Sequence, residues 1–188
     1  MKSVSMSGSL RENVGKKDAK AQRNNGFIPC VMYGGKEQFT FTVDVKQFQH
    51  IIYTPEVKYA TMELNGKTYN AIVQDAQYHP ISGDILHVDF LEVADDRPIT
   101  IGIPIAVTGT SPGVLRGGKL VKKVRKLKVK GLLKNIPEQI NVPIDGLDIA
   151  ENVKVCDLSV NNLTIVEPEN KIVVTVSATR NMEAAPTV

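Results

Sequence analysis

The 188-residue chain contains no tryptophan, two cysteines and three histidines. Cys30 and Cys156 lie far apart and form no Cys-x-x-Cys pair, which favours two free thiols in a reducing compartment over a disulfide. The histidines and cysteines lack the spacing of zinc ligands, so no metal site is expected. No apolar run approaches the roughly 20 residues of a membrane span, and the polar N-terminus does not resemble a signal peptide. These absences predict a cytoplasmic protein with no cofactor and no membrane partner.

The motifs of common catalytic sites are also missing. The chain has no Gly-x-Ser-x-Gly elbow, no His-Glu-x-x-His, no Walker loop and no Gly-x-Gly-x-x-Gly. His79, His87 and Asp89 could in principle pair as a base and the group that orients it, but no other feature supports catalysis. The sequence therefore predicts a protein that is not an enzyme, with no catalytic residue and no small-molecule substrate.

Positive charge is concentrated in two segments, although the net charge of the chain is only +3. Residues 1–36 contain seven basic and two acidic residues, and residues 116–134 contain nine basic residues and no acidic one. The rest of the chain is therefore strongly acidic. This asymmetry favours a polyanionic partner, with solvated charged surfaces as the simpler alternative.

Alternation of apolar and polar residues, typical of half-buried strands, dominates the first half of the chain. Asn65-Gly66 between two alternating runs predicts a tight hairpin, because both central residues of a type I′ turn need positive φ. Asp44 is expected to cap a helix over residues 45–53. Strands with one or two helices indicate a mainly β fold with a closed, six-stranded β-barrel, because closure removes exposed sheet edges.

A second β-rich domain is expected after the proline-terminated segment 94–98. Pro104 within the apolar run 99–107 predicts an edge strand or a bulge. The last eight residues have no periodic pattern and are expected to fray. The predicted organisation is a barrel domain at 1–93, a C-terminal β domain at 94–180 and a flexible tail at 181–188.

The segment 8–26 is basic and poor in core-forming residues. We expect a loop whose positive side chains follow the phosphates of a nucleic acid, since each neutralised phosphate releases counterions. A mobile surface loop without a ligand is the alternative.

Residues 119–131 (KLVKKVRKLKVKG) fit either a helix with an apolar stripe or a strand with one basic face. In both cases one face is cationic, so that it either contacts a polyanionic partner or protects a sheet edge from aggregation. We expect the basic side chains to be exposed in or beside a strand, with Leu127 and Val129 turned inward. The basic side chains are Lys122, Lys123, Arg125, Lys126, Lys128 and Lys130.

Taken together, two motifs in the first half resemble those of the Ctc family, the general-stress-type, 5S rRNA-binding proteins of the bacterial large ribosomal subunit. The first motif comprises Leu10-Arg11-Glu12, Gly15-Lys16-Lys17, Lys20, Arg23 and Gly26-x-Ile28-Pro29-x-Val31-x-Tyr33-Gly34. The second is His87-Val88-Asp89-Phe90, after Gln74-Asp75 and His79-Pro80. The second half, with Gly117-Gly118, Ile136-Pro137 and Asp145-Gly146-Leu147, resembles the C-terminal β domain of the long, two-domain form.

The resemblance implies a ribosome-associated structural protein whose barrel lies against the minor-groove side of 5S rRNA, with other large-subunit components as further partners. It implies phosphate contacts for the basic residues of the first motif: Arg11, Lys16, Lys17, Lys20 and Arg23. It implies a more specific hydrogen-bonding patch of Tyr33, Gln74, Gln77, His87 and Asp89. A stress-related RNA- or tRNA-binding factor acting outside the ribosome stays open, because the family's barrel resembles the anticodon-binding domain of glutaminyl-tRNA synthetase.

Overall fold

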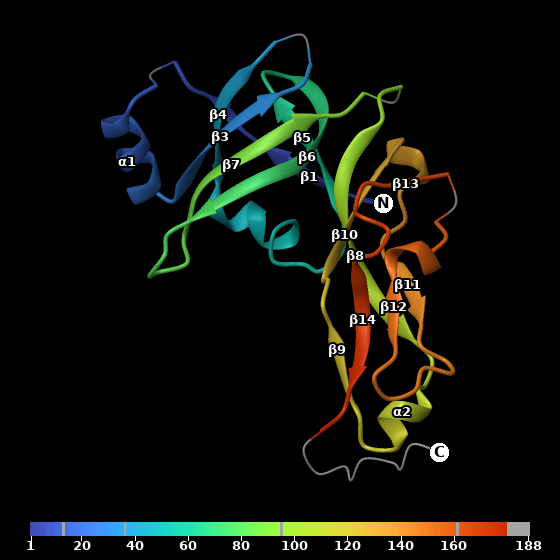
Figure 1. The fold of residues 1–188 in the computed structure, drawn as a ribbon. Coiled ribbons are helices and arrows are strands. Elements are labelled where there is room, and N and C mark those ends of the chain that lie inside the picture. The colour runs from blue at the N-terminus through green and yellow to red at the C-terminus, as the bar shows by residue number, and fades with distance from the viewer. Residues whose placement is uncertain (13, 36, 95, 161, 180–188) are drawn as a thin grey trace, which may run out of the picture. The chain divides into compact units, whose positions relative to one another are not determined.

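A computed structural model of the chain describes residues 1–12, 14–35, 37–94, 96–160 and 162–179. The fold is mainly β, as predicted, and forms two compact units (Figure 1). The first unit comprises Met1–Ile99 and Leu132–Glu138, and the second comprises Thr100–Gly131 and the chain from Gln139 onward. The domain limits 1–93 and 94–180 stay predictions, and the expected tail at 181–188 lies outside the described residues.

The first unit is built on one curled sheet with the strand order β1-β5-β6-β7-β3-β4-β2. Strands β1 and β2, at the two ends of this order, are successive parts of one N-terminal segment, separated only by Gly8. The sheet therefore closes on itself as a barrel of six continuous segments, as the sequence predicted. The strands are β1 (Lys2–Ser7), β2 (Ser9–Leu10), β3 (Phe27–Tyr33), β4 (Phe39–Asp44), β5 (Lys58–Leu64), β6 (Lys67–Tyr78) and β7 (Ile85–Glu92).

Gly8 is the residue at which the N-terminal segment changes partner. Before it, β1 pairs in parallel with β5, and after it, β2 pairs antiparallel with β4. A Cβ on Gly8 would lie 2.8 Å from Phe41 Cδ2 and 3.0 Å from Leu64 Cδ2, both on fully packed side chains. The closure of the barrel thus requires a residue without a side chain at this position.

The core of the barrel is filled by one side of each alternating strand, as the pattern of the sequence predicts. On β3, Ile28, Cys30 and Met32 point inward and are at most 1% exposed. The rings of Phe41 and Phe90 lie 5.9 Å apart between centroids, within the range of favourable aromatic contact. On β7 the opposite side, which carries His87 and Asp89, is half-buried.

The turns follow the local chemistry of the sequence. Asn65 and Gly66 both have positive φ, 49° and 74°, which confirms the predicted hairpin. The Asp44 carboxylate accepts a hydrogen bond of 2.9 Å from Lys46 N, which confirms it as a cap. The element that it caps is a 3₁₀ helix, η1 (Val45–His50), and not an α-helix to residue 53. Only Phe48 is buried on η1, and one anchoring side chain suffices for such a short element.

The segment 8–26 is not a loop throughout, which corrects the sequence prediction. It contains the helix α1 (Lys16–Asn24), which begins after Gly15 in extended backbone (Figure 1). The helix buries no side chain completely, so that the apolar periodicity by which helices are recognised is missing.

The second unit contains two small sheets, one ordered β11-β8-β10-β13 and the other β12-β14-β9. Residues 119–131 form two strands in different sheets, which decides between the helix and strand alternatives. The helices are α2 (Pro112–Leu115) and the 3₁₀ turn η3 (Val155–Asp157), and η2 (Leu133–Asn135) belongs to the first unit. The strands are β8 (Ile99–Thr108), β9 (Lys119–Lys122), β10 (Lys126–Gly131), β11 (Ile140–Pro143), β12 (Asn152–Lys154), β13 (Thr164–Ile165) and β14 (Ile172–Ser177).

Pro104 does not mark an edge strand, because β8 lies between β11 and β10. The short strand β11 pairs only with residues 105–108 of β8 among the described residues. Pro104 therefore sits just beyond the paired stretch, where its missing N–H interrupts no bond to β11.

We expect Gly8→Ala to lower the free energy of unfolding of the first unit by about 1–3 kcal/mol, because the new methyl group overpacks the barrel against Phe41 and Leu64. All tyrosines and phenylalanines lie between residues 27 and 90, so that tyrosine fluorescence in a urea titration reports on this unit. Gly15→Ser is the control, since a Cβ there meets nothing within 4 Å. Equal midpoints for the two variants would contradict the role of Gly8.

We expect one thiol to react rapidly with a disulfide reagent in the folded protein, and two after unfolding. Cys156 is exposed, whereas Cys30 is buried and donates its S–H to Ile28 O at 3.4 Å. Burial raises the pKa of the Cys30 thiol far above its ordinary value, so that the reactive thiolate does not form near neutral pH. Thiol counting on Cys156→Ser should then give no fast reaction, and a fast reaction would place Cys30 outside the core.

Candidate nucleic-acid interface

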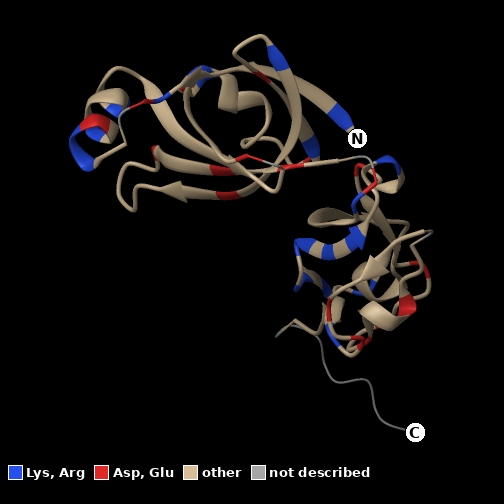
Figure 2. Ribbon diagram, turned by 90° about the horizontal axis from the view of Figure 1, so that it is seen from above, with Lys and Arg blue, Asp and Glu red and all other residues tan. Residues whose placement is uncertain are grey.

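Helix α1 presents a cationic face made of four side chains. Lys16, Lys20 and Arg23 are spaced four and three residues apart, which places them on one side of the helix, with Lys17 beside them. All four are exposed. Within the described part of the chain, the ammonium groups of the three lysines make no hydrogen bond or ion pair. These charges are therefore available to an anionic partner. Figure 2 shows the basic positions of the ribbon in blue.

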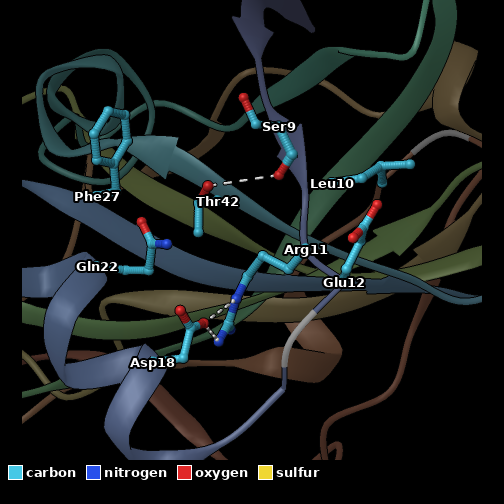
Figure 3. Close-up of a pocket in the computed structure, with 8 residues that line it drawn as sticks. All are labelled: Ser9, Leu10, Arg11, Glu12, Asp18, Gln22, Phe27 and Thr42. Carbon is cyan, nitrogen blue, oxygen red and sulfur yellow. Dashed lines mark hydrogen bonds and ion pairs between the residues drawn. The ribbon is translucent and has the colours of Figure 1, made fainter.

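The opposite side of α1 is held to the barrel by an ion pair between Arg11 and Asp18. The guanidinium of Arg11, which follows β2, donates to Asp18 Oδ2 from Nε at 3.2 Å and also from Nη2 (Figure 3). The Arg11 side chain is only 9% exposed. Arg11 is thus placed to position the helix and to neutralise its one carboxylate.

The other end of α1 is tied to strand β7. Arg23 donates from Nε to the carbonyl oxygen of Leu86 at 3.0 Å, and the residue is exposed. Gly26, with φ of 83°, then turns the chain from the helix into β3. The cationic face of α1 is therefore fixed next to the strand that carries His87 and Asp89.

The outer side of β6 and β7 carries polar groups in register. Gln77 pairs with His87 across the two strands, and Asp75 pairs with Asp89. Paired residues of antiparallel strands point to the same side of the sheet. We refer to Gln77, His87 and Asp89 as the polar patch.

The imidazole and carboxylate of the polar patch lie in contact. His87 Nδ1 is 2.7 Å from Asp89 Oδ1, and both side chains are about one-third exposed, 28% and 31%. The contact is bent away from the ring N–H direction, so that Nδ1 has no aligned hydrogen-bond partner in the described residues. Nδ1 itself is buried, so that a partner can reach the pair only through the exposed parts of the two side chains.

The remaining two predicted residues flank the patch. Gln74 occupies a β-bulge of β6, where the register shifts between Val73 and Asp75, and it is exposed. A bulge turns an extra side chain outward. Tyr33 is half-buried at the end of β3, where it pairs with Leu91 of β7. The structure thus groups the predicted residues around α1 and the outer side of β3, β6 and β7.

Three groups of the candidate interface were given no role in the sequence analysis: the Asp18 carboxylate, the Leu86 carbonyl and Asp75. The first two act through tertiary contacts, with Arg11 and Arg23. The sequence did offer a signal for Asp18, because acidic residues are favoured in the first turn of a helix, and Asp75 stands beside Gln74 in the second motif. Asp75 opposite Asp89 places two carboxylates together, which disfavours phosphate at that point and favours donor groups.

The described residues contain no group of three or more His, Cys, Asp or Glu side chains positioned to bind a metal. Among the same residues, no helix has the length and apolar character needed to cross a membrane.

Comparison with known proteins identifies the family. Residues 6–90 match the model of the ribosomal L25p family, and residues 98–180 match that of the C-terminal domain of ribosomal protein TL5. A protein of Cytophaga hutchinsonii named large ribosomal subunit protein bL25 is 43% identical over 97% of this chain and 95% of its own length. The chain belongs to the ribosomal L25p family.

Other relatives of the same name show the same extent of similarity. The bL25 proteins of Amoebophilus asiaticus and Porphyromonas gingivalis are 39% and 37% identical over 98% of this chain, and cover 94% and 97% of their own lengths. The two family models together confirm the predicted resemblance to the long, two-domain form.

We expect Asp18→Ala to loosen α1 from the barrel, because it leaves the mostly buried Arg11 guanidinium without this carboxylate. The loss of about 1–3 kcal/mol should accelerate hydrogen exchange of the α1 amides by about five- to 100-fold, since 1.4 kcal/mol corresponds to a factor of about ten. The matched control is Glu12→Ala, an exposed carboxylate in the same pocket. Similar exchange in both variants would show that Asp18 does not hold the helix.

Proposed function

We propose that this protein is a structural component of the large ribosomal subunit that binds 5S rRNA through the cationic face of α1 and the polar patch. The observation that carries the proposal is that Arg23 attaches α1 directly to β7, the strand of the polar patch. The lysines of α1 have no partners in the described chain. The names of the relatives, which are large ribosomal subunit proteins, support the assignment to the large subunit. The protein acts by binding, and catalysis has no part in the proposal.

The two parts of the surface have different chemistry. Lysine ammonium groups act as point charges on phosphates, and such contacts give affinity without sequence preference. Glutamine and histidine offer directional donors and acceptors for 2′-hydroxyl groups and base edges. In an RNA helix these groups are accessible in the wide, shallow minor groove. The polar patch would then read the minor groove while α1 holds the flanking backbone.

Asp89 needs a separate role because a carboxylate repels phosphate. In the proposal it accepts from a base amino group or a 2′-hydroxyl, or faces a hydrated Mg²⁺. Arg11 keeps α1 in place, while Gln74 and Tyr33 extend the patch along β6 and β3.

The alternative function, a stress-related RNA- or tRNA-binding factor outside the ribosome, makes a different prediction for cell extracts. A ribosomal component co-sediments with the large subunit at moderate salt, and other large-subunit components are then its neighbours. Recovery of the full chain in the free fraction, bound to tRNA, would decide for the alternative.

We expect binding to 5S rRNA to weaken steeply with salt. Contacts from four cations of α1 give a slope of log affinity against log salt of about −3 to −4, at about 0.7–0.9 per phosphate. Lys17→Ala should make this slope shallower by about 1. Lys67→Ala, an exposed lysine at the hairpin end of the barrel, is the control and should leave the slope unchanged. A slope near zero for the unmodified protein would exclude the electrostatic role of α1.

We expect His87→Ala to weaken 5S rRNA binding by about 1–3 kcal/mol, the usual value of a specific contact to a base edge. The variant should lose affinity for 5S rRNA but not for bulk RNA, so that selectivity falls. His50→Ala, an exposed histidine on η1, is the matched control. If His87→Ala weakens binding to both RNAs equally, His87 contacts the backbone or supports the fold, and the proposed role of the patch is wrong.

A further inference from the structure

The second unit carries a separate row of positive charge on strand β10. Lys126, Lys128 and Lys130 are exposed, while Leu127 and Val129, which alternate with them, are completely buried. The prediction for these five residues is confirmed. Same-side residues of a strand lie about 6.6–6.8 Å apart, so that the three lysines form an evenly spaced row. We call this row the lysine strip.

Further basic residues adjoin the strip. The chain from β9 to β10 keeps Lys122, Lys123 and Arg125 exposed, while Val124 between them is 8% exposed. The predicted exposure of these residues is also confirmed. The backbone of this connection is fixed, because Ile105 N donates to Arg125 O at 3.1 Å and Lys123 N donates to Val173 O at 2.9 Å. The charges are therefore held on an ordered surface.

The residues beside the strip are small and uncharged. A Cβ on Gly102 of β8 would lie 3.5 Å from Lys126 Cβ, which places this glycine next to the first lysine. On the other side, Thr164 of β13 pairs with Lys130. Neither neighbour carries a carboxylate, so that the ammonium groups are not neutralised across the strands.

Acidic side chains of the second unit are engaged elsewhere. Glu167 pairs with Lys171 at 2.7 Å, and Asp148 pairs with Arg116 at 2.8 Å. Asp145 and Asp157 accept from the backbone N–H groups of Thr110 and Lys154. No described carboxylate forms an ion pair with the lysine strip. The unit therefore pairs other cations and leaves this row without counter-charges.

Protection of a sheet edge does not account for Lys128 and Lys130. Strand β10 lies between β8 and β13, β13 pairs with Val129 and Lys130, and Val166 N donates to Lys128 O at 3.0 Å. Edge protection by lysine applies to strands with unpaired backbone groups. It remains an explanation for β9, which is at the end of its sheet.

The composition of the second unit narrows the chemistry of the partner. Residues 91–188 contain no phenylalanine, tyrosine, tryptophan or histidine. Proteins that hold single-stranded nucleic acid stack bases on aromatic rings, and this segment has none. A row of ammonium groups on a surface without rings suits the outer sugar-phosphate backbone of a double helix.

We propose that the lysine strip binds the phosphate backbone of double-helical RNA, as a contact separate from α1 and the polar patch. The partner is RNA because the chain belongs to a ribosomal protein family. The proposal does not rest on 5S rRNA recognition by the first unit, because the contacts are made by different residues.

The experiment uses the full chain with the α1 lysines removed, as Lys16→Gln, Lys17→Gln and Lys20→Gln. This background separates the two surfaces, because none of these ammonium groups has a partner in the described residues. The strip variant adds Lys126→Gln, Lys128→Gln and Lys130→Gln. The control variant instead adds Arg116→Gln, Lys154→Gln and Lys171→Gln, which remove the same charge from other exposed positions of the second unit. The probe is a mixed-sequence RNA duplex of about 20 base pairs.

We expect the background to bind the duplex with a salt-dependent affinity that the control variant retains. The strip variant should show a slope of log affinity against log salt that is shallower by about 2–3, for three phosphate contacts. Equal binding by the strip and control variants overturns the proposal. So does tighter binding of the background to a single strand of the same sequence.

Two further measurements keep the result interpretable. Circular dichroism checks that each variant is folded, and the single change Lys128→Gln, expected to reduce the slope by about 1, replaces the triple variant if that one is not. Vesicles with anionic headgroups test whether the lysine strip binds a lipid surface instead of RNA. Binding of the background to vesicles but not to the duplex overturns the proposal in favour of a lipid surface.

Discussion

The first unit depends on the closure of its barrel by the N-terminal segment. That segment pairs with β5 on one side and with β4 on the other, and the change of partner occurs at Gly8. Without the N-terminal segment, the edges of β4 and β5 would remain open, and the outer sides of β3, β6 and β7 would have no rigid support. Arg11 directly follows the same segment and holds α1 through Asp18. One stretch of the chain therefore shapes the barrel and also orients its most basic element.

The fold follows from the sequence where local chemistry decides it. Asn65-Gly66 needs no distant contact to form its turn, and the inward alternation of β3 is visible in the residues themselves. Helix α1 could not be predicted in this way, because it has no buried stripe and is held by the tertiary pair of Arg11 and Asp18. Of the two alternatives for Pro104, the edge strand is wrong, because β8 lies between β11 and β10, and the short length of β11 is not a property of the β8 sequence.

The candidate site was predictable as a set of residues but not as an arrangement. The residues of the polar patch come from a motif resemblance, and only the β6–β7 register shows that Gln77 and His87 are cross-strand neighbours. The cations divide into two groups for a structural reason. Arg11 is buried by its ion pair, whereas Lys17 and Lys128 stand on surfaces where no described carboxylate reaches them.

The parallel pairing of β1 with β5 has a consequence for synthesis of the chain. Lys2 pairs with Lys58, and Ser7 pairs with Glu63. Strand β1, which is synthesised first, therefore cannot pair until β5 has been synthesised. Pairings between residues so distant in sequence make folding slow, because the chain entropy is lost before the contact forms. The hairpin of β5 and β6 is local and can form early. We therefore expect insertion of the N-terminal segment to be a late step, so that the nascent barrel exposes an open edge until it occurs.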